Sequence, residues 1–320
     1  SSWPRHPERA RARARVCRRP RAPRLAAMDQ RGPSFAALVV AAFALLTATG
    51  APATATASLP WTLDPIGCLG PASWCALYAA TVPAKEALNA ALLFLGTRVL
   101  GWPRIDEGST KVRKLETLET VDWAYLALNS FVEFLGVNHI LAFLLSGPLE
   151  HRLSEFGVAN GPGAFVLAML VNDLLYYPFH AVAHQRWFYP YCHKQHHRQF
   201  VPFRGYLDAS NQHPFEQLCG FSIFLLGLCA AARTVGLHAG AAWVAFLAWA
   251  TLNICNHLAL DSRVHLPLPF PAYPRDHQMH HRFPQCNYST LTTLFDRSFG
   301  SFRPYLALDP SAPATLPNFG

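Results

Sequence analysis

The sequence predicts an all-α membrane protein with four to five membrane helices, two of them paired as a helical hairpin, and a histidine-rich cap on the cytosolic side. Three observations lead to this fold class. The 320 residues are 51% hydrophobic and only 14% charged, whereas soluble domains carry about 25% charged residues. Several apolar stretches approach the roughly 20 residues that a membrane helix needs. Twelve of the fifteen histidines lie between residues 180 and 281.

The N-terminal region is interpreted as upstream or targeting sequence. Residues 1–27 are rich in Arg, Ala and Pro and precede the first methionine, Met28. Residues 28–57 follow the plan of a secretory signal peptide, with a basic start, an apolar run over 35–46 and small residues at 55–57. The alternative is an uncleaved first membrane span. We therefore exclude this region from the prediction of the fold.

The net charge of +8 is confined to the N-terminus. Residues 1–31 hold ten arginines and two acidic residues, and the remainder holds 17 basic and 17 acidic residues. The body of the chain therefore offers no basic surface that would neutralise nucleic-acid phosphates. We expect no nucleic-acid partner.

Four further regions are expected to enter the membrane. They are the stretches 79–100, 123–147 and 164–184, and the pair 217–232 with 239–257. The first is the weakest, because Lys85, Glu86 and Arg98 interrupt it. The last pair is separated by a short link and is expected to form a hairpin, spanning or re-entrant.

The distribution of Lys and Arg orients these spans. Loops 101–121, 185–216 and 258–304 carry four, four and five of these residues, whereas loops 148–162 and 233–238 carry one each. Cytosolic loops of membrane proteins carry the excess of positive charge. The first three loops, which hold most of the histidines, are therefore expected on the cytosolic side.

The histidines form a pattern typical of a metal site. Three clusters and two single residues stand out: His180-x3-His184, His193-x2-His196-His197, His277-x2-His280-His281, His213 and His257. Within each cluster the first and last histidine are four residues apart, which places them on one helical face. Adjacent pairs can present their rings to two neighbouring ions. Imidazole suits iron, copper, zinc and nickel, and eight to ten ligands exceed the needs of one ion. The other histidines are interpreted as ordinary hydrogen-bonded residues.

Several metal chemistries are disfavoured by motifs that the sequence lacks. It contains no HExxH zinc-protease motif and no Glu-x-x-His pair of carboxylate di-iron bundles. It also has no CxxCH haem attachment and no nucleotide-binding glycine pattern. An all-imidazole site for two ions in a membrane favours iron and dioxygen chemistry.

At these residues the sequence resembles the fatty acid hydroxylase and sterol desaturase superfamily of membrane di-iron oxidases. The resemblance covers roughly residues 120–304. It rests on the order of the histidine boxes, on NDLLYYPFH before His184, on HPFE from His213, and on the stretch 276–302. That last stretch is most similar to sterol C-5 desaturases and sterol methyl oxidases. Asn253 stands where some members carry another histidine, and Ser289 stands at a common glycine.

The resemblance implies two iron ions and a specific set of ligands. The implied ligands are His180, His184, His193, His196, His197, His257, His277, His280 and His281. His213 is either a tenth ligand or an outer group, and Asn253 either holds a metal-bound water or packs in the hairpin. Candidates to orient the rings are Asp173, Asp208, Glu216 and Asp276, each alternatively an ordinary interfacial charge. Asp173 is favoured, because an acid within a span is costly unless it has a role. Asp296 and Arg297 are expected to form a structural ion pair.

The resemblance also implies an O2-dependent enzyme that hydroxylates or desaturates a sterol or fatty acyl lipid. Electrons would come from a b-type cytochrome or a ferredoxin with its reductase. Residues 58–121 would form a luminal segment, first span and cytosolic loop, 122–304 the catalytic domain and 305–320 a tail. The expected location is the endoplasmic reticulum, with a plastid membrane as the alternative.

Three alternatives to this function remain open. A carotenoid or other lipid hydroxylase would use the same metal centre. A histidine-rich metal transporter is disfavoured, because only Glu133, His139 and Asp173 are expected deep inside the membrane and the clustered histidines gather at one surface. A scaffold that keeps the fold without activity is the third alternative, against which the intact histidine boxes argue.

Overall fold

The computed structural model describes most of the chain beyond residue 70, namely residues 71–105, 118–146, 156–198, 205–262 and 264–306. The chain divides into two units, Ser1–Thr49 and Gly50–Gly320. The first unit lies wholly outside the described residues, and everything below concerns the second. The predicted upstream segment and signal peptide, and most of the predicted tail, therefore lie outside the described residues.

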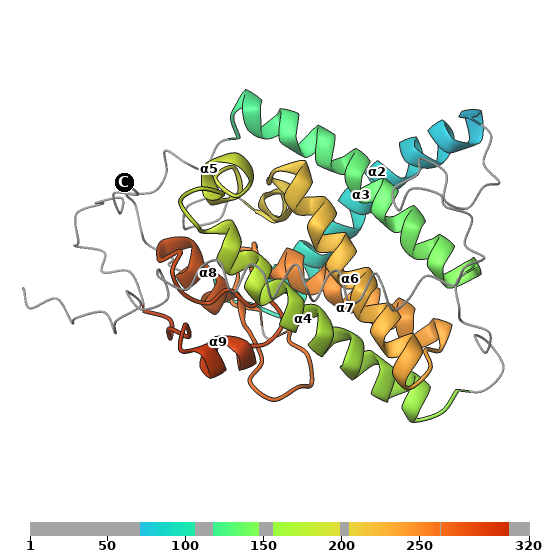
Figure 1. The fold of residues 1–320 in the computed structure, drawn as a ribbon. Coiled ribbons are helices and arrows are strands. Elements are labelled where there is room, and N and C mark those ends of the chain that lie inside the picture. Colours follow the sequence, from blue (N-terminus) through green and yellow to red (C-terminus); the bar gives the residue numbers. More distant parts are fainter. Residues whose placement is uncertain (1–70, 106–117, 147–155, 199–204, 263, 307–320) are drawn as a thin grey trace, which may run out of the picture. The chain divides into compact units, whose positions relative to one another are not determined.

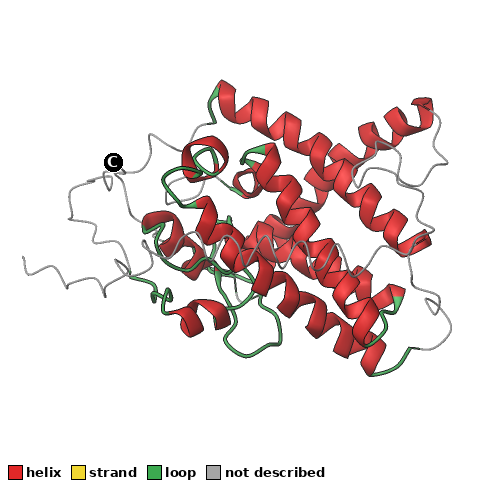
Figure 2. Cartoon of the chain, viewed as in Figure 1, coloured by secondary structure: helices red, strands yellow, loops and turns green. Residues whose placement is uncertain are grey.

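Helices form the regular structure, and the described ranges contain no strand (Figure 2). The α-helices are α2 (Pro71–Phe94), α3 (Thr120–Ser146), α4 (Ala164–Ala183), α5 (Tyr189–Cys192), α6 (Pro214–Thr234), α7 (Ala239–Asn256), α8 (Pro274–Arg282) and α9 (Leu294–Phe299). Short π and 3-10 turns are η3 (Leu95–Val99), η5 (Ala159–Gly163), η6 (His196–Arg198) and η7 (Tyr206–Ser210). The predicted all-α fold class is confirmed.

Three helical segments in the described ranges are long and apolar enough to cross a membrane: Ala159–Ala183, Pro214–Thr234 and Ala239–Asn256. The last two, α6 and α7, are consecutive helices joined by a short link, as expected of a hairpin. Helices α2 and α3 form where two further spans are predicted, with Lys85 and Glu86 inside α2 and Glu133 inside α3. Lys85 Nζ of α2 pairs with Glu133 Oε2 of α3 at 2.5 Å, which stabilises their contact.

Helix α4 is the centre of the bundle. It packs most extensively against α6 and also against α7 (Figure 1). Helix α6 in turn packs against α3. Small residues permit the close approach of α4 and α6, because a Cβ added at Gly227 would stand 2.6 Å from the carbonyl oxygen of Ala168. Such small-residue contacts are typical of packed membrane helices. Any larger residue at position 227 would push the two helices apart.

The C-terminal section returns to this bundle. Helix α8 contacts α7, and α9 contacts α4. As a result, the last histidine box, on α8, lies beside the end of α4 that carries the first box. The fold thereby brings together histidines that are about 100 residues apart in the sequence.

Candidate metal centre

The structure gathers the nine histidines implied as ligands into two groups. The first group is His180, His184, His193, His197 and His280. The second group is His196, His257, His277 and His281. Within each group the ring nitrogens lie within 4.8 Å of one another. Each group therefore offers enough imidazole nitrogens for one metal ion.

Each HxxHH box contributes to both groups. The adjacent residues His196 and His197 belong to different groups, and so do His280 and His281. Neighbouring side chains in the turn η6 and in helix α8 point in different directions, so one box can reach two sites. The sequence predicts this division from the adjacent pairs, and the structure shows it.

Hydrogen bonds at Nδ1 fix the orientation of four of these rings. The partners are oxygen atoms: His180 with Tyr288 O at 2.6 Å, His193 with Glu216 Oε1 at 2.7 Å, His257 with Asn253 O at 2.8 Å and His280 with Cys286 O at 2.7 Å. Carbonyl and carboxylate oxygens accept hydrogen bonds, so these Nδ1 atoms carry the ring proton. In a neutral ring the Nε2 atom then holds a lone pair that can bind a metal.

These lone pairs face one another in the first group. His180 Nε2 lies 3.1 Å from His193 Nε2, although both rings donate through Nδ1. Two lone pairs at this distance repel unless a cation lies between them. Nitrogens bound at about 2.1 Å and at right angles around one ion stand about 3 Å apart. The donor set and its spacing therefore fit a metal ion.

The second group has a similar spacing. His257 Nε2 lies 3.3 Å from His196 Nε2 and 3.0 Å from His277 Nε2. His281 Nε2 lies 3.1 Å from His277 Nε2. All four side chains are buried, so bulk water does not solvate their nitrogens. A second ion fits here on the same grounds.

Burial keeps these histidines neutral. It lowers the pKa of His257 to about 4, because removal from water disfavours the charged ring. The pKa values of six other histidines also lie well below the usual 6.5. Burial is the main cause, and the neighbouring imidazoles are the second. These histidines are His184, His193, His196, His197, His277 and His280. The neutral ring is the form that binds a metal.

A pH dependence of stability follows for the metal-free protein. The folded-state pKa values are depressed, so below about pH 6.5 the unfolded chain binds protons that the folded chain does not. Stability is therefore fully present above that pH and falls as the pH drops. We expect the melting temperature of the metal-free protein to decrease as the pH is lowered from about 6.5 to about 5.5. A melting temperature that stays constant over this range would contradict the burial of neutral rings.

His213 lies in neither group. It is the N-cap residue of α6, where its Nδ1 accepts a hydrogen bond from the backbone N–H of Phe215 at 3.2 Å. Its ring lies 6.0 Å from that of Tyr125. The structure therefore does not support the tenth-ligand interpretation, and gives His213 a structural role at the start of the helix that carries Glu216.

A conservative replacement separates these roles of His213. Asparagine is among the best N-cap residues, so His213→Asn should retain the metal content of the parent. His213→Ala should lose about 0.5–2 kcal/mol of stability without losing metal. Metal analysis and thermal melting of both variants test this, and loss of metal in His213→Asn would restore the ligand interpretation.

Glu216 and Asn253 support the centre in different ways. Glu216 is buried and accepts a hydrogen bond from His193 directly, as expected of an orienting carboxylate. The side chain of Asn253 donates to Trp249 O in its own helix, and it is the backbone carbonyl of Asn253 that accepts from His257. Its side chain is thus used in helix packing.

The other two predicted acids, Asp276 and Asp208, are not among the grouped ligands. Asp276 accepts from the N–H of Tyr273 at 3.0 Å and caps α8, the helix of the last box. Burial raises the pKa of Asp276 to about 6. Asp208 is buried in η7 and belongs to neither group. Asp276 therefore supports the last box through the backbone of the helix that carries it.

Asp173 holds the loop that follows the last box. Its carboxylate accepts from the backbone N–H groups of Thr290, Leu291 and Thr292 at 3.1–3.3 Å and from the Thr292 hydroxyl at 2.6 Å. The same loop presents the carbonyl of Tyr288 to His180. Asp173 therefore orients the His180 ring indirectly, by fixing the loop whose Tyr288 carbonyl accepts the hydrogen bond from His180 Nδ1.

The predicted ion pair between Asp296 and Arg297 is wrong. Asp296 instead accepts from the N–H groups of Tyr288 and Ser289 and from the Ser301 hydroxyl, at 2.7–2.9 Å. The Arg297 guanidinium lies 3.8 Å from the centre of the Phe302 ring. Adjacent residues of a helix point in different directions, so Asp296 turns inward to the loop while Arg297 stacks outward.

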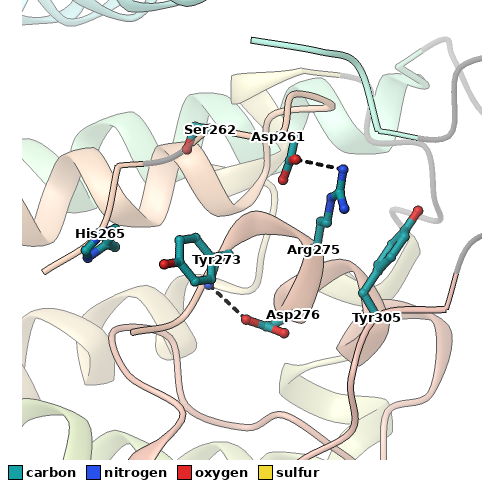
Figure 3. A pocket seen from close by; sticks show the side chains of 7 residues that line it. All are labelled: Asp261, Ser262, His265, Tyr273, Arg275, Asp276 and Tyr305. Carbon is teal, nitrogen blue, oxygen red and sulfur yellow. Dashed lines mark hydrogen bonds and ion pairs between the residues drawn. The ribbon is translucent and has the colours of Figure 1, made fainter. Parts of the chain in front are cut away.

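A separate pocket of about 510 Å³ lies beside the start of α8 (Figure 3). Its lining is Asp261, Ser262, His265, Tyr273, Arg275, Asp276 and Tyr305. Arg275 Nη2 and Asp261 Oδ2 form an ion pair at 2.7 Å across it (Figure 3). None of its lining residues belongs to the two histidine groups, so we assign the chemistry to the histidines and not to this pocket.

Comparison with known proteins agrees with this site. Residues 165–301 match the family model for fatty acid hydroxylases. Methylsterol monooxygenase 1 of Gallus gallus is 28% identical over 144 residues, 43% of this chain and 45% of the relative. The Danio rerio protein of the same name is 30% identical over 139 residues, 41% and 43% of the two chains. A Delta(7)-sterol 5(6)-desaturase of Gibberella zeae is 29% identical over 176 residues, 51% and 49%.

These matches cover about half the length of the relatives, and no solved structure matches the chain. The fold and the site define a helical protein with apolar helices long enough to span a membrane and two clustered groups of imidazoles. Within that class, the segment 165–301, which contains all nine histidines, matches the fatty acid hydroxylase family. The predicted resemblance to this superfamily is confirmed.

Proposed function

We propose that the protein is an iron-dependent membrane oxidoreductase that hydroxylates or desaturates a sterol or a related lipid. The observation that carries this proposal is the pair of buried imidazole groups inside the family segment. The relatives are named as sterol monooxygenases and sterol desaturases, which favours a sterol over a carotenoid. Two iron ions bound at these groups would supply the activation of dioxygen and the removal of hydrogen from an unactivated C–H bond.

The residues of the chain set the conditions for that reaction. The nine histidines would hold the metals as neutral ligands. Glu216 accepts a hydrogen bond from Nδ1–H of His193, which keeps the ring oriented and its Nε2 electron-rich. Buried side chains exclude bulk water from the centre, and this protects reactive species from side reactions. Specificity would come from placing one carbon of the lipid near the metals.

The surroundings of the reaction are part of the proposal. The described residues include three segments long enough to span a membrane, so the substrate would reach the site from the bilayer. The excess of Lys and Arg in the loops around the histidine cap favours a cytosolic location for it. A b-type cytochrome, or a ferredoxin with its reductase, would deliver electrons there, with the endoplasmic reticulum as the expected location.

Expression of the full chain with untargeted lipid profiling tests the proposed function. The parent should convert a host sterol or another lipid into a product with one more oxygen or two fewer hydrogens. The His196→Ala variant, expressed at the same level, should give the profile of the empty vector. If the parent changes no lipid while binding iron, a catalytic role would be contradicted and the scaffold interpretation supported.

A further inference from the structure

Asp122 is a buried carboxylate outside the family segment. It lies in the first turn of α3, 43 residues before that segment begins, and none of its surface is exposed. An ionised side chain is stable in such a place only if other groups satisfy its charge and its hydrogen-bonding capacity. Its partners therefore show what it does.

Three polar groups donate to Asp122, and two come from distant parts of the chain. Its Oδ1 accepts from Gln195 Nε2 at 3.0 Å and from Asn211 Nδ2 at 2.9 Å. Its Oδ2 accepts from the backbone N–H of Glu119 at 2.8 Å. Gln195 Nε2 also donates to Asn211 Oδ1 at 2.8 Å. Together these bonds tie α3 to the second histidine box.

The residues that contact Asp122 flank the adjacent histidines of that box, His196 and His197. Gln195 directly precedes His196, and Arg198, whose Nε lies 4.0 Å from Asp122 Oδ1, directly follows His197. These two histidines belong to different metal groups. A shift of this turn would therefore disturb both groups at once.

The second box needs such support because its own structure is short. The four-residue helix α5 and the three-residue turn η6 are the regular elements around it. Turns of this length make few internal hydrogen bonds and depend on tertiary contacts for a fixed position. The first and third boxes, by contrast, begin on helices of 20 and nine residues.

We propose that Asp122 is a positioning residue that holds the second histidine box, through Gln195 and Asn211, in the geometry that serves both metal groups. Helix α3 is then part of the support of the centre, although it lies outside the matched family segment. This inference rests on the proposed metal centre.

The test compares two acids that both contact Arg198. Asp122→Asn keeps the size of the side chain but removes its charge and replaces one acceptor by a donor. Glu119→Gln is the matched control, because Glu119 pairs with Arg198 at the surface and is 66% exposed. Exposed pairs of this kind contribute little. Metal-free parent and variants, purified in detergent, are titrated with Co²⁺ and followed by visible absorption and thermal melting.

Asp122→Asn should weaken Co²⁺ affinity by about 10–100-fold, the usual effect of losing an outer support of a metal site, and should alter the Co²⁺ spectrum. Glu119→Gln should remain within about twofold of the parent. Gln195→Met removes the amide that donates to Asp122 and keeps a side chain of similar length. This variant should show the same loss of Co²⁺ affinity, and it provides the test if Asp122→Asn does not fold.

Two results would overturn the inference. In the first, Asp122→Asn or folded Gln195→Met keeps the Co²⁺ affinity and spectrum of the parent, even if its melting temperature is lower. This would show that Asp122 has a purely structural role, and it would overturn this inference alone. Failure of the parent itself to bind Co²⁺ would overturn the proposed metal centre and this inference together.

Discussion

Replacing His196 by alanine should abolish product formation and lower the bound iron. His196 is buried, and its Nε2 lies 3.3 Å from that of His257 in the four-histidine group. The variant leaves three imidazoles there, and packing cannot replace a missing ligand. Even the loss of an outer partner of a ligand costs about 10–100-fold, so the loss of a ligand should cost more. Product analysis and iron content of the purified variant measure the effect.

The matched control is a histidine in a different role. His238 is the N-cap of α7, where its Nδ1 accepts from the N–H of Gly240 at 3.0 Å, and its ring contacts that of Phe156. His238→Asn keeps a capping oxygen, so activity should stay within a few-fold of the parent, as for a surface change of about 0.5 kcal/mol. Full activity in His196→Ala, or equal loss in His238→Asn, would show that the histidine boxes are misread.

Replacing Asp173 by alanine should have the largest effect on stability. The change leaves three backbone N–H groups and one hydroxyl, all buried, without their acceptor. Each buried donor that is left without an acceptor costs about 1–3 kcal/mol, so we expect a loss of more than about 4 kcal/mol. The yield of monodisperse protein in detergent and its melting temperature measure this loss.

A graded variant shows whether the loop is the cause. Asp173→Asn retains one acceptor oxygen for the loop and should lose only part of the stability. Movement of the loop should also displace the Tyr288 carbonyl, which accepts the hydrogen bond from His180 Nδ1. Both variants should therefore bind iron less tightly than the parent. Parental stability of Asp173→Ala would contradict the role of this carboxylate as the anchor of residues 290–292.

Much of the helical bundle could be predicted from sequence. The stretch predicted at 164–184 corresponds to α4, and the predicted hairpin corresponds to α6 and α7. Continuous apolar runs with Pro, Gly and His at their ends carry a strong signal, because burial and capping act within each segment. The stretch that corresponds to α2 gives a weaker signal, because Lys85, Glu86 and Arg98 interrupt it and the sequence does not show that Lys85 pairs with Glu133 of α3.

The histidines of the centre were likewise visible in the sequence, because metal-binding imidazoles recur at spacings that local geometry imposes. Their supports were not. The carbonyl groups of Tyr288 and Cys286 carry no side-chain signature, and an acid in the first turn of a helix, such as Asp122, is commonplace. Only the tertiary fold reveals that Asp122 reaches Gln195 and that Asp296 turns toward the loop.

The metal content of the purified full chain tests the central claim most directly. The protein is reconstituted anaerobically with excess Fe²⁺, freed of unbound metal, and analysed for iron and zinc against protein concentration from amino-acid analysis. With five imidazoles in one group and four in the other, the account predicts two iron ions per chain and one after His196→Ala. A folded, monodisperse parent that retains no iron, or only one ion per chain, would contradict it.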